Sequence, residues 1–100
     1  MARQLERDFQ KKLIKYLRAE FPDAIILKND PTYLQGVPDL VVLQDGYWAA
    51  LEVKRSEDEH HQPNQDYYVD LMDNMGFAAF VTPNNYIIVI EEMRAYFFDD

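Results

Sequence analysis

The sequence predicts an α/β fold in which helices flank a mixed β-sheet. The elements follow the order α-β-β-β-α-β, with an extra strand near the C-terminus. In two segments the apolar residues recur every three or four positions, which is the spacing of a helix that packs on one side. Between and after these segments lie short apolar stretches bounded by turn residues, which are typical of strands in a sheet covered by helices.

Residues 3–20 are expected to form the first helix, and Pro22 ends it because proline cannot continue a helix. The apolar stripe of this helix comprises Leu5, Phe9, Leu13, Tyr16 and Leu17. At about 100° per residue, the opposite face carries Arg7, Lys11, Lys15 and Arg18. A short strand, Ala24–Lys28, is expected to follow.

A β-hairpin is expected from residues 39–43 and 47–54. The segment Gln44-Asp45-Gly46 between them contains Asp-Gly, which is a strong signal for a hairpin turn. A loop at 29–36 precedes the hairpin, and a polar loop at 55–62 follows it.

The second helix is expected at 63–76, because this segment begins with proline and ends with glycine. Residues 77–81 are the next expected strand. After a turn at 83–85, residues 86–90 are expected to form the extra strand, and residues 91–98 are expected to form a terminal helical turn or two.

The size of the chain, 100 residues, suits one domain that spans 1–100. The chain has no cysteine, so disulfides and thiolate metal ligands are excluded. No apolar run approaches the roughly 20 residues of a membrane span, and the N-terminus lacks the apolar middle region of a signal peptide. These features predict an intracellular protein without a membrane partner.

Charge is unevenly distributed along the chain. The formal net charge of −8 argues against simple nucleic-acid binding, yet residues 1–18 hold six basic and only two acidic residues. A basic helix face can bind phosphates by releasing their counterions, although an ordinary solvated face would have the same composition. The candidates for phosphate contacts are Lys11, Lys15, Lys28 and Arg55.

The residues that point most directly to chemistry are Asp39, Glu52 and Lys54. Side chains alternate along a strand, so Glu52 and Lys54 share one face while Val53 points to the core. With the turn near Asp45, Asp39 lies opposite Glu52 on the neighbouring strand. Two carboxylates and one amine are therefore expected at one end of the hairpin, where buried charges need a partner or a metal.

This set of residues suits the hydrolysis of phosphodiester bonds. Mg²⁺ or Mn²⁺ prefers oxygen ligands, which Asp39, Glu52 and the Val53 backbone carbonyl would supply. A bound cation lowers the pKa of water and neutralises charge on the phosphate. Lys54 would orient or deprotonate that water, or stabilise the developing negative charge, and the sequence does not distinguish these roles. Taken alone, Glu-x-Lys is often only a solvated ion pair.

The segments Gly36-Val37-Pro38-Asp39-Leu40 and Glu52-Val53-Lys54, with the downstream Gln65, resemble the motifs of the PD-(D/E)xK nuclease superfamily. Within it, the chain is most similar to the virus-type replication–repair nuclease family (VRR-NUC), over nearly its whole length. The resemblance implies a restriction-endonuclease-like core, with catalytic Glu6 on the first helix and catalytic Gln65 on the second. It also implies a metal-dependent DNA endonuclease that cuts branched DNA such as Holliday junctions, acts as a homodimer and works in the cytoplasm of a bacterium or of a phage-infected host.

The residues themselves support Glu6 and Gln65 less directly. Glu6 lies at the edge of the apolar stripe, about 60° from Phe9, so it can turn inward, but it can also be an ordinary solvated glutamate. Gln65 could hydrogen-bond a water or phosphate in the site, or the Glu52 carboxylate. A capping or merely exposed role for Gln65 explains its position equally well.

Other features of the sequence leave alternatives open. Three consecutive acids, Glu57-Asp58-Glu59, would repel DNA close to the proposed site, and the adjacent His60-His61 cannot easily share one metal ion. A non-catalytic DNA- or partner-binding module on a nuclease fold is therefore an alternative function. An acidic mimic of DNA is a further alternative, although the basic first helix argues against it. The aromatic residues Tyr96-Phe97-Phe98 could form a dimer interface or complete the core.

Overall fold

The computed structural model describes residues 2–99, with the side chains of residues 5–99. The elements within this range are α1 (Ala2–Glu20), β1 (Ile25–Lys28), β2 (Leu40–Gln44), β3 (Tyr47–Val53), α2 (Gln65–Met75), β4 (Phe77–Val81) and α3 (Tyr86–Phe98). The strands form one sheet in the order β1-β2-β3-β4. The first three strands pair antiparallel and β3 pairs parallel with β4, so the sheet is mixed.

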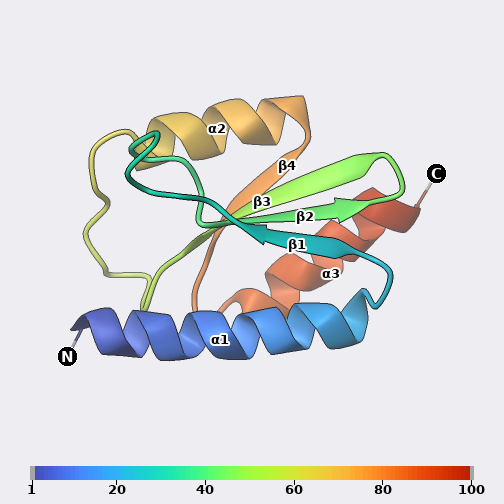
Figure 1. Cartoon of the computed structure of the whole chain (residues 1–100), viewed down its shortest axis with the longest axis horizontal. Helices are drawn as coiled ribbons and strands as arrows, with labels where there is room; N and C mark the ends of the chain where they lie inside the picture. The colour runs from blue at the N-terminus through green and yellow to red at the C-terminus, as the bar shows by residue number, and fades with distance from the viewer. Residues whose placement is uncertain (1, 100) are drawn as a thin grey trace.

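The elements stack in three layers (Figure 1). Helices α1 and α3 cover one face of the sheet, and α2 covers part of the other. Parallel strands need a long crossover connection, which α2 provides between β3 and β4. The predicted α/β fold and its α-β-β-β-α-β order are confirmed.

The β2–β3 hairpin forms at the predicted turn. Asp45 (φ 49°) and Gly46 (φ 87°) both have positive φ, as the central residues of a type I′ turn require. In the resulting register Leu40 lies opposite Leu51. The residue before β2 is therefore brought opposite the next residue of β3, and this sets the geometry of the site.

Most predicted boundaries move by one or two residues, which is the usual scatter of element ends; α1, β1 and β2 begin at Ala2, Ile25 and Leu40 rather than at 3, 24 and 39. Gln44 was assigned to the turn, but it pairs with Tyr47 and so belongs to β2. β3 ends at Val53 rather than at Lys54, and α2 begins at Gln65 rather than at residue 63.

The larger core lies between the sheet and the helices α1 and α3. From α1 it receives Phe9, Leu13 and Leu17, which are buried as the predicted stripe requires. Leu5 belongs to the same predicted stripe but is 61% exposed. The N-terminal turns of α1 extend past the end of the sheet, so this position has no sheet surface to cover it (Figure 1).

The predicted extra strand at 86–90 is wrong, because Tyr86–Phe98 forms the single helix α3. The fully or nearly buried residues of this helix recur every three or four positions and are Val89, Ile90, Met93 and Phe97. Ile87 and Ile88 are exposed. The β-branched residues here favour a strand locally, but burial of the helical stripe against the sheet overrides that weak preference.

The C-terminal aromatic residues mainly complete the core. Phe97 packs edge-on against Phe21, with ring centroids 5.6 Å apart, and Tyr96 packs against Phe77 at 5.9 Å. Phe98 is half-exposed and stacks on the other side of Phe21. These contacts join the end of α3 to the end of α1.

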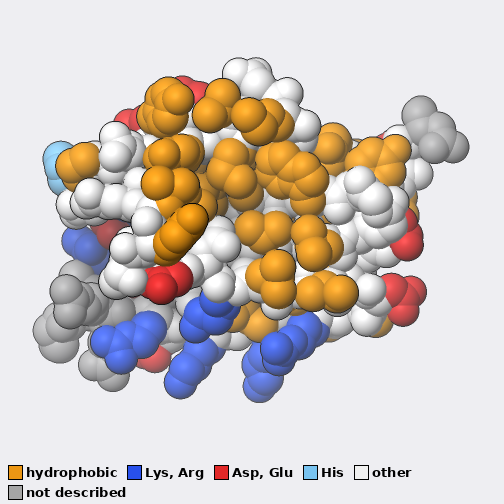
Figure 2. All heavy atoms as spheres, turned by 45° about the horizontal axis from the view of Figure 1, so that its top comes forward, with side chains coloured by type: hydrophobic (Ala, Val, Ile, Leu, Met, Phe, Trp, Pro, Cys, Tyr) orange, Lys and Arg blue, Asp and Glu red, His pale blue; other side chains and the backbone are white. Residues whose placement is uncertain are grey.

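A smaller core lies under α2, where Val69 and Met72 pack against Ala50 and Ala78 of β3 and β4. The same face of β1 and β2 remains open to solvent. Cross-strand pairing and alternation put four apolar side chains there. Val41 is partly buried, and the exposed fractions of the others are 58% for Ile25, 47% for Leu27 and 37% for Leu43. Figure 2 shows hydrophobic side chains gathered across this face, with Lys and Arg side chains along one border.

None of the helices within residues 2–99 has both the length and the apolar character that crossing a membrane requires.

Candidate active site

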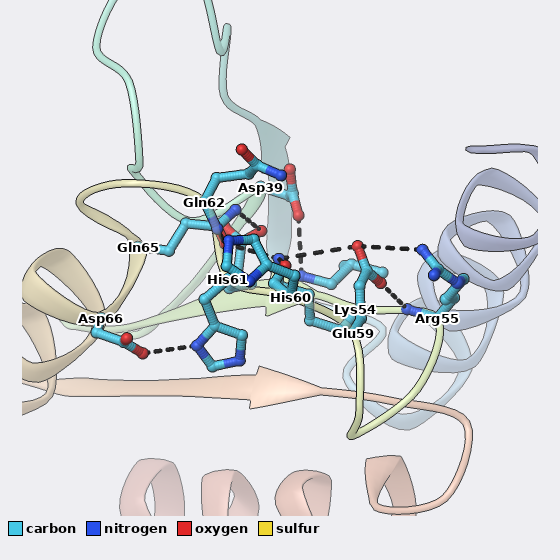
Figure 3. A network of polar contacts seen from close by, with 11 residues as sticks. Asp39, Lys54, Arg55, Glu59, His60, His61, Gln62, Gln65 and Asp66 are labelled. Atoms are coloured by element: carbon cyan, nitrogen blue, oxygen red, sulfur yellow. Dashed lines mark hydrogen bonds and ion pairs between the residues drawn. The ribbon is translucent and has the colours of Figure 1, made fainter. Parts of the chain in front are cut away.

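The predicted site residues meet at one end of the sheet. Asp39 directly precedes β2, Glu52 is the penultimate residue of β3, and Lys54 directly follows β3. Gln65 is the first residue of α2, which begins above the same end of β3 (Figure 3). The hairpin register and the start of α2 therefore bring together residues from three elements.

The loop before Asp39 is held tightly against the start of α2. Gly36 has a φ of +92°, and a Cβ built on it would lie 2.6 Å from the Cβ of Asn64. A larger residue would clash there, so the Gly36-Val37-Pro38-Asp39 segment depends on glycine for its close approach to α2. Asn29 anchors the segment from the other side, because its side-chain amide donates to the Pro38 carbonyl at 2.7 Å.

Asp39 and Glu52 form a buried pair of carboxyl groups within hydrogen-bonding reach of each other. Burial, and then the charge and hydrogen bond of Asp39, raise the pKa of Glu52 to about 9. Burial also raises the pKa of Asp39, against the lowering effect of the Val53 backbone N–H, which donates to Asp39 Oδ2 at 2.9 Å. The raised pKa of Glu52 favours its protonated form at neutral pH.

The Val53 carbonyl faces the same side as Asp39. The N–H and C=O of a strand residue point to the same edge, and the Val53 N–H bonds to Asp39. Two carboxylates and a carbonyl fit a hard cation that keeps several water ligands. Within residues 2–99, no three His, Asp or Glu side chains already form a group that could hold a metal ion. Water and substrate oxygens would therefore have to complete the coordination.

Lys54 is only 2% exposed, and its amine is held by several groups. Its Nζ donates to Gln65 Oε1 at 2.6 Å and to the His60 carbonyl at 3.4 Å. The Lys54 backbone N–H donates to Val81 of β4 at 2.9 Å, which fixes the residue just beyond the end of β3. A buried amine with these partners is rigidly placed.

Gln65 links the acidic and basic parts of the site. Its Nε2 donates to Glu52 Oε2 at 3.0 Å, while its Oε1 accepts both from Lys54 and from the Gln62 backbone N–H. One amide thus sets the position of Glu52 relative to Lys54. The sequence left a capping or exposed role open for Gln65, and the structure favours the contact with the site.

Glu6 reaches the site from α1. Burial, and then a hydrogen bond with Glu59, raise the pKa of Glu6 to about 7; the negative charges of Glu59 and Asp39 add to the rise, and the positive charge of Lys54 opposes it. Its carboxyl group therefore turns inward, as its place at the edge of the apolar stripe allowed.

Glu59 is a residue that sequence reasoning missed. Its Oε1 accepts the Arg55 backbone N–H at 2.7 Å, and its Oε2 lies 3.7 Å from the Arg55 guanidinium and 3.8 Å from Lys54 Nζ. The sequence suggested only an acidic loop that repels DNA. No local pattern could have singled out Glu59 from its acidic neighbours, because a turn of the loop, with Glu59 N–H bonded to the Ser56 carbonyl, aims it inward.

No protein-family model matches this chain, and no curated protein matches it significantly. The chemical capacity of the site therefore follows from its own geometry. Asp39 and Glu52 can bind a cation and lie beside the fixed amine of Lys54. Glu6 and Glu59 border the same site. Such a set can position a cation, a water and a negatively charged substrate together.

The two histidines have different surroundings. His60 offers its backbone carbonyl to Lys54, whereas the His61 ring hydrogen-bonds Asp66 through Nδ1 at 2.7 Å and stacks on Phe80 with centroids 4.2 Å apart. Figure 3 shows the His61 ring directed towards Asp66. The structure thus gives His61 a role in fixing the loop to α2 and β4.

The candidate phosphate-binding residues are not all brought to the site. Arg55 lies beside it through its contacts with Glu59. Lys11 and Lys15 are exposed on α1, the helix that carries Glu6. Lys28 is exposed on β1, but its cross-strand partner Leu40 faces the α1 side of the sheet, opposite to Glu52.

Proposed function

We propose that this chain is a metal-dependent endonuclease that hydrolyses phosphodiester bonds of DNA. One observation carries the proposal: Asp39 and Glu52 are paired, and Gln65 connects Glu52 to the buried amine of Lys54. Burying ionisable groups destabilises a fold unless they are partnered by charge, hydrogen bonds or metal. A hydrolytic function would explain why these ionisable groups are kept at the end of the sheet.

Mg²⁺ or Mn²⁺ is the proposed cofactor, and Asp39, Glu52 and the Val53 carbonyl are the groups that would hold it. When bound, such a cation supplies an activated water and offsets charge on the phosphate. Glu52 must give up its proton to become a ligand, so cation binding should strengthen as the pH rises.

Lys54 is proposed to act as a hydrogen-bond donor in the reaction. Its amine is directed into the site by Gln65 and by the His60 carbonyl. From there it orients the attacking water or stabilises negative charge on the phosphate. Gln65 is a positioning residue, because it holds Glu52 and Lys54 together. Glu6 is proposed to hold a water at the site from the α1 side.

Branched DNA, such as a Holliday junction, is the proposed substrate, on the strength of the resemblance to the VRR-NUC family. The exposed basic side chains Lys11 and Lys15, together with Arg55, would bind the phosphate backbone. Lys28 would contact the DNA only if the DNA wraps around the edge of the sheet. The proposed place of action is the cytoplasm of a bacterium or of a phage-infected host.

A homodimer is the proposed assembly, because a junction needs two matched cuts and each chain has one site. The open apolar face of β1 and β2, with Ile25, Leu27 and Leu43, is the proposed interface. The exposed basic residues of α1 border this face on one side (Figure 2). The other side is bordered by α2.

A stable interface covers about 800 Å² on each partner. That is about one eighth of the 6614 Å² accessible surface of the chain. The proposed interface would therefore have to extend from the open face onto the helices that border it.

Cleavage assays test the proposed function. The purified protein is incubated with a four-way junction, a flap and a linear duplex, in Mg²⁺, Mn²⁺ or EDTA. Cutting is expected with either metal and not with EDTA, and Asp39→Asn and Lys54→Gln should each abolish it. Asp70→Asn, at an exposed position of α2, and Lys12→Gln are the matched controls and should cut normally.

A non-catalytic binding module is the second candidate function, and the ion pair of Lys54 with Glu59 favours it, because this contact neutralises the amine. Binding of junctions without metal-dependent cutting would support this second function. Cutting by Asp39→Asn at the wild-type rate would overturn the assignment of the site.

A further inference from the structure

Three hydrogen-bond donors or cationic groups converge on the Glu59 carboxylate. They are the Arg55 backbone N–H at 2.7 Å, the Arg55 guanidinium at 3.7 Å and the Lys54 amine at 3.8 Å. The Glu59 side chain is 16% exposed and the Lys54 side chain is 3% exposed, so the carboxylate lies over the amine rather than out in solvent. Figure 3 shows Glu59 between these two basic residues.

A backbone N–H, a guanidinium and an ammonium group are the donors that proteins use to bind phosphate oxygens. A carboxylate and a phosphodiester carry the same charge and accept the same hydrogen bonds. Both cannot take these donors at once, because the second anion would lie against the first. The basic groups nearest to the paired acids are therefore occupied by an anion of the chain itself.

We propose that the Glu59 carboxylate occupies the binding position of a backbone phosphate, and that the 55–62 loop withdraws it when DNA binds. The identity of the anion rests on the proposed nuclease function. The Lys54–Arg55 pair is then the phosphate-binding part of the site, and Glu59 restrains the empty enzyme by competing with the substrate.

Withdrawal of Glu59 requires movement of the 55–62 loop alone. The carboxyl group of Glu59 shares a hydrogen bond with Glu6, and this contact has to break when Glu59 leaves the site. The loop that carries it is polar and largely exposed, from Arg55 to Gln62. Moving a single side chain of such a loop disturbs neither of the two cores.

Phosphate titration tests the proposal without relying on cleavage. The ¹⁵N-labelled wild type, Glu59→Gln and Glu57→Gln are titrated with inorganic phosphate at constant ionic strength, and the Arg55 amide resonance is followed. Glu57 is exposed on the same loop and forms no ion pair with Lys54 or Arg55 within the described residues, so its variant removes the same charge without removing a partner of that pair. Glu59→Gln should bind phosphate about tenfold more tightly than the other two proteins, because a like charge is removed from contact with the anion.

Equal phosphate affinity of the Glu59→Gln and Glu57→Gln variants would overturn the proposal, since net charge alone would then explain any gain. The amide spectrum of each variant should be that of a folded protein, so that local unfolding does not explain a change in phosphate affinity. Because the readout is an amide at the site, it decides the question even for a chain that cuts no DNA.

DNA assays separate this proposal from the proposed function. Glu59→Gln should bind a four-way junction about tenfold more tightly in EDTA than the wild type and Glu57→Gln do. Loss of cutting by Glu59→Gln, without tighter binding, would make Glu59 a positioning residue of the reaction and would overturn the competition proposed here. Absence of cutting by the wild type, with tight phosphate binding by Glu59→Gln, would reject the nuclease but keep the phosphate position.

Discussion

Glu52 is the residue whose charge is most costly to the fold. It is 3% exposed and lies opposite Asp39, and these two facts raise its pKa to about 9. Glu6, at the margin of the site, has a pKa raised to about 7. A site that holds protonated carboxyl groups in the absence of cation is poised to exchange protons for a divalent ion.

The metal-free protein should lose stability as the pH rises. The pKa of Glu52 in the folded chain is higher than its unfolded value near 4.5. The group therefore contributes its full stabilisation of the fold at a pH below this unfolded pKa. This contribution is lost as the pH rises through about 9. We expect the free energy of unfolding in EDTA to fall by at least about 1 kcal/mol between pH 5 and pH 9, measured by urea denaturation.

Glu52→Gln should remove most of this decline, because glutamine carries no charge at any pH. Glu6→Gln serves as the control and should remove only the part lost near pH 7. Addition of Mg²⁺ should lessen the decline in the wild type. A wild-type stability that rises across this range would contradict the burial of Glu52.

Gln65 should matter more than its neighbour Gln62. Gln65→Ala removes the amide that holds Glu52 and Lys54, and outer partners of this kind typically contribute about 10–100-fold to activity. Gln62→Ala keeps the backbone N–H that bonds to Gln65 and should change the rate little. Single-turnover cleavage rates of the two variants make the comparison, and equal losses would refute the bridging role.

Among the elements, α3 illustrates how packing overrides local preference. Its first five residues are Tyr-Ile-Ile-Val-Ile, which favour a strand, yet the buried positions follow a helical spacing through Phe97. A strand would bury alternate residues and so treat Ile88 and Ile90 alike. In the helix, Ile90 is fully buried and Ile88 is 65% exposed.

Ile90→Ala should therefore destabilise the protein by about 2–5 kcal/mol, through lost burial and the cavity left behind. Ile88→Ala makes the same chemical change on the same helix and should alter stability by no more than about 0.5 kcal/mol. Urea denaturation at one pH compares the two variants. Equal destabilisation would be the result expected of a strand.

At the scale of the whole molecule, the distribution of charged and apolar surface follows the three-layer arrangement. The basic residues of α1 lie along one border of the open sheet face (Figure 2), whereas Asp66 and Asp73 of α2 lie towards β4, where they bond His61 and the Ala78 backbone N–H. The formal net charge of −8 therefore conceals a basic border that suits DNA binding.

A dimer formed through the open face should be broken by a charge placed there. Leu27→Glu, at a 47% exposed position of β1, should yield a monomer in sedimentation experiments at micromolar concentration. Ile88→Glu introduces the same charge at an exposed apolar position of α3 and should leave the dimer intact. A monomeric wild type, or a dimer that survives Leu27→Glu, would rule out this interface.

Phosphate binding along α1 should depend on the face of the helix. Lys11→Gln should weaken binding of junction DNA and reduce the slope of log affinity against log salt by about 0.9. Lys12 borders the same surface hollow as Lys11, but it also lines a cavity with Tyr16 and Tyr86 on the α3 side, so Lys12→Gln should have a smaller effect. Equal effects of both changes would indicate only a long-range effect of net charge.

Much of the site could be predicted because its determinants are local. An Asp-Gly turn sets the register of one hairpin, and that register alone brings Asp39 opposite Glu52. Alternation along the strand then separates Glu52 from Val53. These features depend on backbone geometry over a few residues, which the sequence by itself determined.

The tertiary structure decided what depends on distant contacts. Whether Gln65 faces Glu52, and whether Glu59 turns onto Lys54, depends on how α2 and the 55–62 loop pack on the end of the sheet. The helical state of residues 86–90 likewise depends on a sheet surface built from other parts of the chain. Local propensities differ by less than about 1 kcal/mol per residue, whereas burying an Ile side chain contributes about 1.5–3 kcal/mol, so packing prevails wherever the two disagree.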